Sequence, residues 1–449
     1  MSKIFLVSSN TTVNPYPVYP IGISIIASAL AAHGHQVSQF DFLVEDQSEE
    51  RLCKAIADFT PDFVGISLRN IDAVDSFSAS DTWYISSNLR VMKAIRGTTR
   101  APVILGGSAF SIMPEEILSY LDADYGIVGE GETAVCSLVS ALEQGRSMPP
   151  ITNNSNVGLS EKGMPYHPLW DSALVDYYRG ESGMMGIQTK RGCPYQCTYC
   201  TYPAIEGTRV RYKSADDVAD EVEALKKAYG VDTFYFTDSI FNDEKGVYLD
   251  VAETLVQRDT GIKWSAFFRP DRIGSDELSL LKRSGLYAIE TGCDAASDDT
   301  LSGLNKQFTF GDVYDFNEAC VKARIPCAHY IMFGGPGETD ASLKEGLRNI
   351  ETLKHCMVFG FSGIRIFPQT VLQRQAMEDG VLDGKESLLK PAYYYSPAID
   401  VQTMNEAVTE GFRGRRDRVF PPSDGLEKLK AMNRFGYRGL LWDHLVSFR

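Results

Sequence analysis

The sequence predicts an α/β protein built from two successive units, each with a parallel sheet. Short apolar runs alternate with helix-like segments in two series, and a stretch rich in polar residues, Pro and Gly separates the series. Strands that alternate with helices are typical of parallel sheets. We therefore expect a doubly wound, Rossmann-like sheet first and a partial (β/α)6 barrel of the TIM type second, followed by a small C-terminal region.

The first series starts with an apolar run at residues 3–7 and a helix-like segment at residues 21–33. Further strands are expected at residues 36–42, 63–68, 103–105 and 125–128, and further helices at residues 49–59, 84–95, 114–120 and 132–142. Loops at residues 8–20, 69–82, 106–110 and 129–132 follow these strands. Ligands of doubly wound sheets bind at such strand ends, and glycines there let a backbone approach a ligand. An inert packing domain is the alternative, and the absence of a phosphate-loop motif disfavours a nucleotide triphosphatase.

The second series begins after residues 149–183, where periodicity fails and a linker is expected. Strands are expected at residues 184–189, 233–237, 264–268, 287–291, 328–333 and 359–367, and helices after Ser214 and at residues 247–256, 277–283, 310–323 and 342–353. We place the first domain at residues 1–148, the barrel at 184–374 and a C-terminal cap region at 375–449. This last region either caps the barrel mouth or serves only for packing.

Composition and charge favour a small-molecule partner. The chain has 449 residues, 44% of them hydrophobic, which suits two or three globular domains. A formal net charge of -15, spread along the chain, argues against a nucleic acid or an anionic membrane surface as the main partner. The best apolar run, at residues 21–32, is too short to span a bilayer, so no membrane association is expected.

The nine cysteines indicate a reducing environment. No signal peptide is recognised, and the cysteine spacing does not resemble a disulfide framework, so we expect a cytoplasmic protein. Five of the cysteines are expected to pack as small apolar residues: Cys53, Cys136, Cys320, Cys327 and Cys356.

Three other cysteines stand close together, at Cys193, Cys197 and Cys200. Three thiolates can ligate three irons of a four-iron cluster and leave the fourth iron open for a substrate or cofactor. The alternatives are a zinc knuckle and three unrelated buried cysteines. Zinc usually needs a fourth Cys or His at short range, and the nearest downstream histidine is His329. The spacing therefore favours an iron-sulfur cluster.

The ends of the predicted barrel strands carry groups that suit a zwitterionic amino-acid nucleoside. Carboxylates can bind ribose hydroxyls or an amino group, an arginine can bind a carboxylate, and glycines permit close approach. A capped or ion-paired structural role is the alternative for each residue alone. The candidates are Asp238, Arg269, Glu290, Gly334, Gly335, Pro336 and Ile366.

As a set, these motifs resemble the radical S-adenosylmethionine (SAM) superfamily. The resemblance rests on the cysteine spacing with Tyr199 before the last cysteine, and on Tyr202-Pro203, Glu206-Gly207, Arg211, Glu290-Thr291-Gly292 and the segments at residues 334–339 and 366–370. Residues 20–22, 34–37, 105–107 and 129–132 resemble the branch whose N-terminal domain is of the cobalamin (B12)-binding type. The likeness covers roughly residues 1 to 370.

The resemblance implies a [4Fe-4S] cluster held by the three cysteines, which binds SAM and cleaves one of its carbon-sulfur bonds. An external electron donor of the flavodoxin or ferredoxin type would supply the electron. Tyr199 would pack beside the adenine, and Glu290 and the Gly334-Gly335-Pro336 segment would line the SAM site. Asp238, Arg269 and Ile366 are carried over only by their strand-end position.

This sequence departs from the family pattern at three points. The Asp-x-His-x-x-Gly motif that ligates cobalamin is absent, although many members of the branch hold cobalamin without a protein ligand, so cobalamin occupancy stays open. The usual Pro-Gly-Thr reads Pro368-Gln369-Thr370. Cys293 stands where Ser often follows Glu-x-Gly, and it is either a catalytic thiol near the radical site or a packing residue.

The function first expected is the transfer of a SAM-derived carbon group to a small molecule, in the form of methyl transfer through methylcobalamin. A cobalamin-independent alternative transfers the 3-amino-3-carboxypropyl arm of SAM to a trivalent arsenical, as in arsinothricin biosynthesis; arsenic is thiophilic, so Cys293 could then matter. Radical ring formation or contraction is a third possibility. A non-catalytic cobalamin or iron-sulfur sensor is the alternative from another class.

Overall fold

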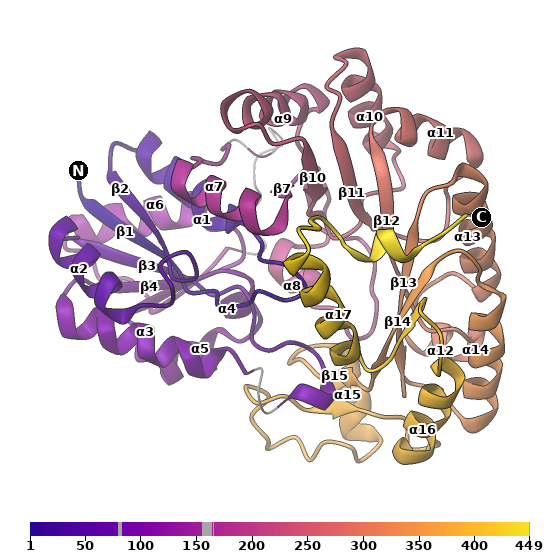
Figure 1. The fold of residues 1–449 in the computed structure, drawn as a ribbon. Coiled ribbons are helices and arrows are strands. Elements are labelled where there is room, and N and C mark those ends of the chain that lie inside the picture. The colour runs from indigo at the N-terminus through magenta and orange to yellow at the C-terminus, as the bar shows by residue number, and fades with distance from the viewer. Residues whose placement is uncertain (80–82, 155–163, 165, 449) are drawn as a thin grey trace.

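The computed structural model describes residues 1–79, 83–154, 164 and 166–448 and contains two parallel sheets (Figure 1). The first sheet has the strand order β2-β1-β3-β4-β5-β6. Its strands are β1 (Lys3–Ser8), β2 (Gln36–Asp41), β3 (Phe63–Ser67), β4 (Val103–Gly106), β5 (Tyr125–Val128) and β6 (Ile151–Asn153). Because β1 lies between β2 and β3, the strand order reverses there, and ligands of such sheets bind at the carboxyl ends of the strands beside the reversal.

Helices cover both faces of this sheet. They are α1 (Ile21–Ala32), α2 (Glu49–Phe59), α3 (Ile85–Thr98), α4 (Ser108–Ile112), α5 (Pro114–Leu121) and α6 (Glu132–Glu143). α1 packs on α6, and α2 packs on α3. Local sequence explains where α2 begins, because the Ser48 hydroxyl accepts a hydrogen bond from Arg51 N and two glutamates occupy the first turn.

The second sheet forms the open barrel, with the strand order β17-β14-β13-β12-β11-β10-β7. Its strands are β7 (Met185–Ile187), β10 (Thr233–Phe236), β11 (Lys263–Phe268), β12 (Leu286–Asp294), β13 (Cys327–Phe333), β14 (Met357–Ser362) and β17 (Arg418–Val419). The outer helices are α9 (Ala215–Tyr229), α10 (Val247–Gln257), α11 (Ser275–Arg283), α12 (Asp298–Gly303), α13 (Phe310–Ala323) and α14 (Asp340–Thr352). The predicted doubly wound sheet and partial parallel barrel are both confirmed.

Regular elements also occur where the sequence indicated none. β6 and α7 (Ser172–Ser182) lie within the expected linker, and α4 occupies part of the loop expected at residues 106–110. α7 begins at Asp171, whose carboxylate accepts hydrogen bonds from Ala173 N and Leu174 N, and it buries one apolar face. β6 is an edge strand of the first sheet, although it lies beyond residue 148, the predicted end of the first domain. The division of the chain into domains stays a prediction.

Short elements follow β14 along the chain and lie around the barrel. They are β15 (Ile364–Arg365), α15 (Val371–Glu378), β16 (Tyr393–Tyr394), α16 (Val401–Phe412), α17 (Pro422–Arg434) and the 3-10 turn η2 (Trp442–Leu445). β17 adds a seventh strand to the predicted six. Trp442 packs with Met184, Ala288 and Ala328 at the beginnings of barrel strands. The end of the chain therefore packs at the end of the barrel where the strands begin.

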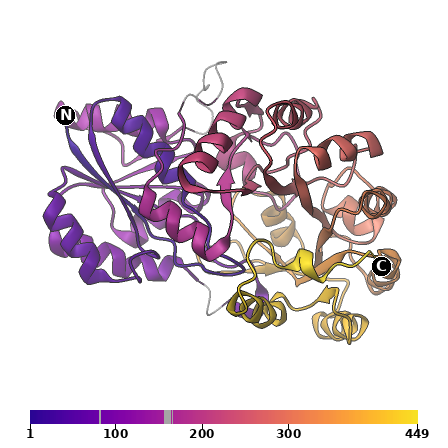
Figure 2. The ribbon, with the colours of Figure 1, turned by 45° about the horizontal axis from the view of Figure 1, so that its top comes forward.

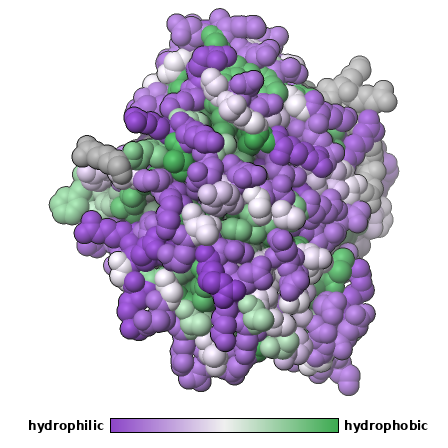
Figure 3. Space-filling model, turned by 90° about the vertical axis from the view of Figure 1, so that its right-hand side faces the viewer, coloured by the Kyte–Doolittle hydropathy of each residue, from purple (hydrophilic) through white to green (hydrophobic). Residues whose placement is uncertain are grey.

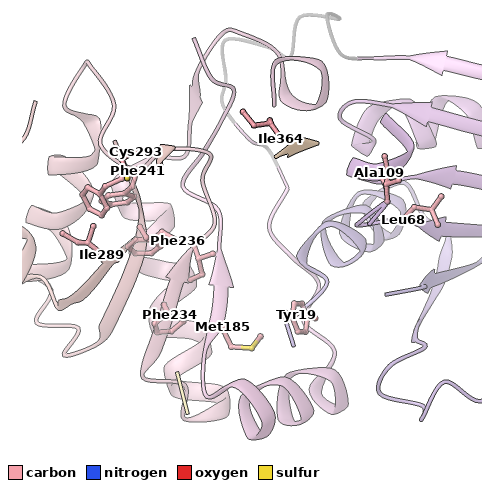
Figure 4. Close-up of a cluster of buried hydrophobic side chains, with 14 of the residues drawn as sticks. Tyr19, Leu68, Ala109, Met185, Phe234, Phe236, Phe241, Ile289, Cys293 and Ile364 are labelled. Carbon is pink, nitrogen blue, oxygen red and sulfur yellow. The ribbon is translucent and has the colours of Figure 1, made fainter. Parts of the chain in front are cut away.

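One continuous apolar cluster joins the two sheets. Figure 4 shows Tyr19, Leu68 and Ala109 of the first domain together with Met185 and Phe234 of the barrel, all of them members of this cluster. A buried ion pair reinforces the contact, with Arg365 Nε 2.8 Å from Asp72 Oδ2 and both side chains 1% exposed. Figure 2 shows the two domains side by side along this contact.

The outer surface differs from this interior. On the barrel side of the molecule, hydrophilic residues predominate and apolar residues are scattered among them (Figure 3). Among the described helices, none is both long enough and apolar enough to span a membrane.

Candidate functional site

The three clustered cysteines lie in a loop that leaves the first barrel strand. This cysteine loop, residues 192–207, connects β8 (Lys190–Arg191) to β9 (Arg211–Tyr212) and contains α8 (Tyr202–Glu206). Gly192 has φ +93°, and a Cβ there would lie 2.3 Å from Arg209 O, so the turn requires glycine. Backbone hydrogen bonds then fix the loop, among them Cys193 N to Gly207 O at 3.1 Å and Thr198 N to Leu304 O at 3.1 Å.

The thiols of this loop are neighbours in a poorly solvated place. Burial, and then the charge of Cys197, raises the pKa of Cys193 above its usual value and raises that of Cys200 to about 12. Three thiolates at this place therefore need nearby positive charge. Among the residues that the structure describes, no three His, Cys, Asp or Glu side chains are placed to hold a single metal ion. A four-iron cluster is held differently, with one thiolate on each of three irons.

A buried ammonium group supplies some of that charge. Lys306 Nζ lies 2.5 Å from Asp294 Oδ2, and the Tyr199 hydroxyl donates to the same carboxylate oxygen. Burial alone would lower the pKa of Lys306, but Asp294 and Cys197 raise it above its usual value. Lys306 Nζ also stands 6.0 Å from the centre of the Tyr199 ring. The sequence analysis missed Asp294 and Lys306.

Asp238 and Arg269 both hold the backbone around the cysteine loop. The Asp238 carboxylate accepts hydrogen bonds from Thr189 N at 2.8 Å and Lys190 N at 3.2 Å. Arg269 donates to Lys306 O at 2.5 Å, and its guanidinium stacks on the Tyr195 ring at 4.1 Å. These contacts place both residues beside the loop.

Glu290 lies inside the barrel among donors from three elements. Its carboxylate accepts hydrogen bonds from Tyr235 OH at 2.7 Å, Tyr330 OH at 2.6 Å and Trp442 Nε1 at 3.1 Å. Burial, and then the Glu290 charge, raises the pKa of both tyrosines well above 10, so they remain protonated donors. Trp442 is 152 residues away in the chain, and no sequence signal linked it to Glu290.

The Gly334-Gly335-Pro336 turn follows β13 and is held by Glu338. Gly334 has φ +91°, and a Cβ there would lie 2.8 Å from the Tyr395 ring. The buried Glu338 carboxylate accepts hydrogen bonds from Gly334 N and Gly335 N. Burial raises the pKa of Glu338 to about 7. Pro336 packs through its carbonyl against Gly303, where a Cβ would not fit.

Two candidates are fully buried. Cys293 is 0% exposed, its thiol donates to Tyr330 O at 3.2 Å, and burial raises its pKa to about 12. Figure 4 shows it among apolar side chains, which favours the packing role over the catalytic one. Ile366 is 1% exposed, and its backbone N–H donates to Ala392 O at 2.9 Å.

A cavity of about 450 Å³ lies between the first sheet and the barrel. Its walls include Tyr16 and Tyr19 from the loop after β1, Arg69 and Asn70 after β3, and Tyr202, Tyr235, Asp238 and Phe267 from the barrel side. The cavity therefore sits where the strand order of the first sheet reverses and faces the barrel strands beside the cysteine loop. A second cavity, of about 660 Å³, is lined by Cys193 and by residues of β8 and β9.

Comparison with known proteins agrees with this two-part site. Residues 9–139 match the B12 binding domain, and residues 187–350 match the radical SAM superfamily. The chain joins a B12 binding domain to a radical SAM domain.

Several known proteins are similar to this chain over most of their length. Tryptophan 2-C-methyltransferase of Streptomyces laurentii is 25% identical, over 81% of this chain and 73% of the relative. Cytidylyl-2-hydroxyethylphosphonate methyltransferase of Streptomyces wedmorensis is 24% identical, over 94% of this chain and 91% of the relative. The structure of the methyltransferase TsrM from Kitasatospora setae, with cobalamin and a [4Fe-4S] cluster bound, shares the fold with a TM-score of 0.85 at 22% identity and covers 98% of this chain and 97% of that one.

A radical SAM domain implies a [4Fe-4S] cluster and SAM, and the residues of this chain fit the cluster. The three thiols stand in one loop, which the Gly192 turn and backbone hydrogen bonds fix, and the ammonium group of Lys306 lies in the same site, paired with Asp294. The assignment of Cys193, Cys197 and Cys200 as its ligands remains a proposal.

The B12 binding domain implies a possible cobalamin, and the cavity between the domains is where it would face the barrel. Gly107 has φ +95°, and a Cβ there would lie 2.5 Å from Leu68 O, so glycine lets the turn after β4 lie against the end of β3. Among the described residues, those that line the cavity include no histidine. Tyr16, Arg69 and Asn70 offer polar contacts that suit part of a corrinoid, without a histidine ligand. Tyr16, Arg69 and Asn70 lie in loops that were expected to face a ligand, but the sequence did not single them out.

Proposed function

We propose that this protein is a cobalamin-dependent radical SAM methyltransferase that acts on a small molecule. The observation that carries the proposal is the cavity at the strand-order reversal of the B12 binding domain, which opens onto the barrel strands beside the cysteine loop. The two methyltransferases that this chain resembles over most of both lengths support methyl transfer over aminocarboxypropyl transfer, ring formation and a sensor role.

The residues of the chain then have distinct tasks. Cys193, Cys197 and Cys200 hold the cluster as thiolates, and Lys306, fixed by Asp294, offsets part of their negative charge. When bound, the cluster supplies an electron and the corrinoid supplies a methyl carrier, while the protein supplies binding and orientation.

The remaining candidates shape the SAM site and the space beside it. The Gly334-Gly335-Pro336 turn, held by Glu338, offers backbone for close approach to SAM, and Tyr199 offers a ring beside the adenine. Glu290 keeps Tyr235 oriented at the cavity wall. Aromatic side chains along this wall limit access of water to the acceptor.

The proposal includes an external electron donor and a cytoplasmic location. The cluster needs a one-electron reductant, which a flavodoxin or ferredoxin type of protein supplies. A reducing compartment suits the nine free cysteines.

The test is the fate of SAM in an anaerobic incubation. Protein reconstituted with iron, sulfide and hydroxocobalamin is given a reductant and SAM with a trideuterated methyl group. We expect a visible corrinoid spectrum on the purified protein, S-adenosylhomocysteine by mass spectrometry, and transfer of the label to the corrinoid. Cys197→Ala is expected to abolish SAM turnover. Methylthioadenosine as the product from a protein with no corrinoid band would overturn methyl transfer and support aminocarboxypropyl transfer.

A further inference from the structure

Two glutamates of the B12 binding domain reach the base of the cysteine loop. Glu130 and Glu132 follow β5, and Arg191 and Arg211 belong to β8 and β9. Arg191 Nη1 lies 3.2 Å from Glu130 Oε2 and 2.5 Å from Glu132 Oε1, and Arg211 Nη2 pairs with Glu130 Oε1. The exposed fractions of these four side chains lie between 6% and 14%. The contact is therefore a buried charge cluster between the two domains.

The β8–β9 ribbon needs these carboxylates. Arg191 and Arg211 are directly opposite each other in its antiparallel pairing. Like charges at such positions repel each other, and a two-stranded ribbon is at best marginally stable alone. Glu130 accepts hydrogen bonds from both guanidinium groups, and its negative charge offsets the repulsion between the two arginines.

A chain of hydrogen bonds continues from this cluster to the first cysteine. Arg191 Nε donates to Gln188 Oε1 at 2.8 Å, and Gln188 Nε2 donates to Glu206 Oε1 at 3.0 Å. The other oxygen of Glu206 accepts from Gly192 N at 3.0 Å, one residue before Cys193. Arg211 also donates to Glu206 O at 2.9 Å. These hydrogen bonds therefore connect the charge cluster to the backbone that carries the thiols.

We propose that Glu130 and Glu132 are positioning residues, which hold the cysteine loop in its cluster-binding conformation through Arg191 and Arg211. The B12 binding domain then has a second task besides ligand binding, because it completes the cluster site of its neighbour. This inference rests on the proposed role of the cysteine loop, but its first test requires neither SAM turnover nor cobalamin.

The first test measures hydrogen exchange in the apoprotein by mass spectrometry. In Glu130→Gln/Glu132→Gln, we expect amides of the cysteine loop to exchange at least about tenfold faster than in the wild type, because the two guanidinium groups lose their charged partners. Amides of β12 and β13 serve as an internal reference and are expected to keep their rates. Glu116→Gln changes an exposed glutamate of the same domain and is the matched control.

The second test measures iron content and the electron paramagnetic resonance spectrum of the reduced, reconstituted protein. We expect the double glutamine variant to bind less than half of the wild-type iron or to give an altered spectrum. Glu130→Asp/Glu132→Asp keeps both charges and is expected to restore iron binding toward the wild-type level.

The outcomes are distinct from those of the SAM assay. Wild-type exchange rates in the loop together with a wild-type spectrum in the double glutamine variant would overturn the positioning role, whatever reaction the enzyme performs. Equal slowing or acceleration across all barrel amides would also overturn it, because the effect would then be global. If only the SAM assay fails, the reaction class is wrong and the positioning role stands on the exchange data.

Discussion

At the residue scale, the charges around the cysteine loop are buried and paired. A buried ion without a partner costs several kcal/mol, so Lys306 is tolerated in this place because Asp294 lies 2.5 Å away. The pair contributes one positive and one negative charge near the thiols that we propose as cluster ligands, which would bind as thiolates. Cys197 also contributes to the raised pKa of Lys306, so the ammonium group is electrostatically coupled to the cysteine loop.

Replacement of Lys306 by Met is expected to make the cluster harder to reduce. The change removes a positive charge and leaves the Asp294 carboxylate, so the added electron is less stabilised. We expect a midpoint potential lower by about 60 mV, which is a tenfold change for one electron. A redox titration followed by electron paramagnetic resonance measures it. Lys306→Arg keeps the charge and is the control; an unchanged potential in the Met variant would show that Lys306 does not act on the cluster.

The raised pKa of Glu338 predicts that the stability of the protein depends on pH. Its pKa in the folded protein is about 7, above the usual 4.5, so its contribution to stability is complete below pH 4.5 and is lost as the pH rises through 7. We expect the apoprotein to lose up to about 3 kcal/mol of folding free energy through this group between pH 5 and 8. Glu338→Gln should reduce the fall in melting temperature over that range, and Glu345→Gln, at an exposed position of α14, should not. Parallel curves for Glu338→Gln and the wild type would contradict the assignment.

At the element scale, the helices that the sequence predicted well have capping residues of their own at their N-termini. α9 begins after Ser214, whose hydroxyl accepts a hydrogen bond from Asp217 N, as expected for an N-cap. α13 has the same bounds as predicted and a capping box between Thr309 and Asp312. β6 and β17 escaped prediction because strands of two or three residues have no measurable period and exist through the strands that they pair with.

Gly192 is an element-scale determinant of the cysteine loop. In Gly192→Ala, the new Cβ would lie 2.3 Å from Arg209 O at a φ that disfavours side chains, so the ribbon and the loop must shift. We expect reconstituted protein to bind less than half of the wild-type iron, as measured by a colorimetric iron assay. Gly97→Ala is the control, because a Cβ there meets no atom within 4 Å and alanine suits its helix. Equal iron in both variants would mean that the loop tolerates the side chain.

At the scale of the whole molecule, the candidate site could be predicted only in part. The cysteine spacing and the strand ends indicated which loops meet, because parallel strands bring their carboxyl ends to one edge. The partners of those residues could not be predicted, since Glu130 with Arg211, Asp72 with Arg365 and Trp442 with Glu290 are brought together only by tertiary packing. Asp238 and Glu290 were expected to face SAM, and their observed partners are backbone amides and aromatic donors.

The end of the chain closes the barrel where its strands begin. Leu440, Leu441 and Trp442 are 1%, 0% and 3% exposed, and the tail crosses in front of the central barrel strands in Figure 1. Trp442 both fills this space and donates to Glu290, so its loss leaves a cavity and a carboxylate with one donor fewer. The tail is therefore expected to contribute to the stability of the whole barrel.

Trp442→Ala is expected to destabilise the apoprotein by about 3–5 kcal/mol, the usual range for a large buried aromatic residue. Thermal unfolding followed by circular dichroism measures the loss. Trp442→Phe keeps most of the volume but lacks the N–H donor to Glu290, so it should lose about 1–3 kcal/mol and thereby separate packing from hydrogen bonding. Phe435→Ala, at an 83% exposed position of the same tail, should stay within about 0.5 kcal/mol of the wild type. If Phe435→Ala and Trp442→Ala were equally stable, the tail would not contribute to the stability of the barrel. The Glu290 carboxylate would then be held by Tyr235 and Tyr330 alone.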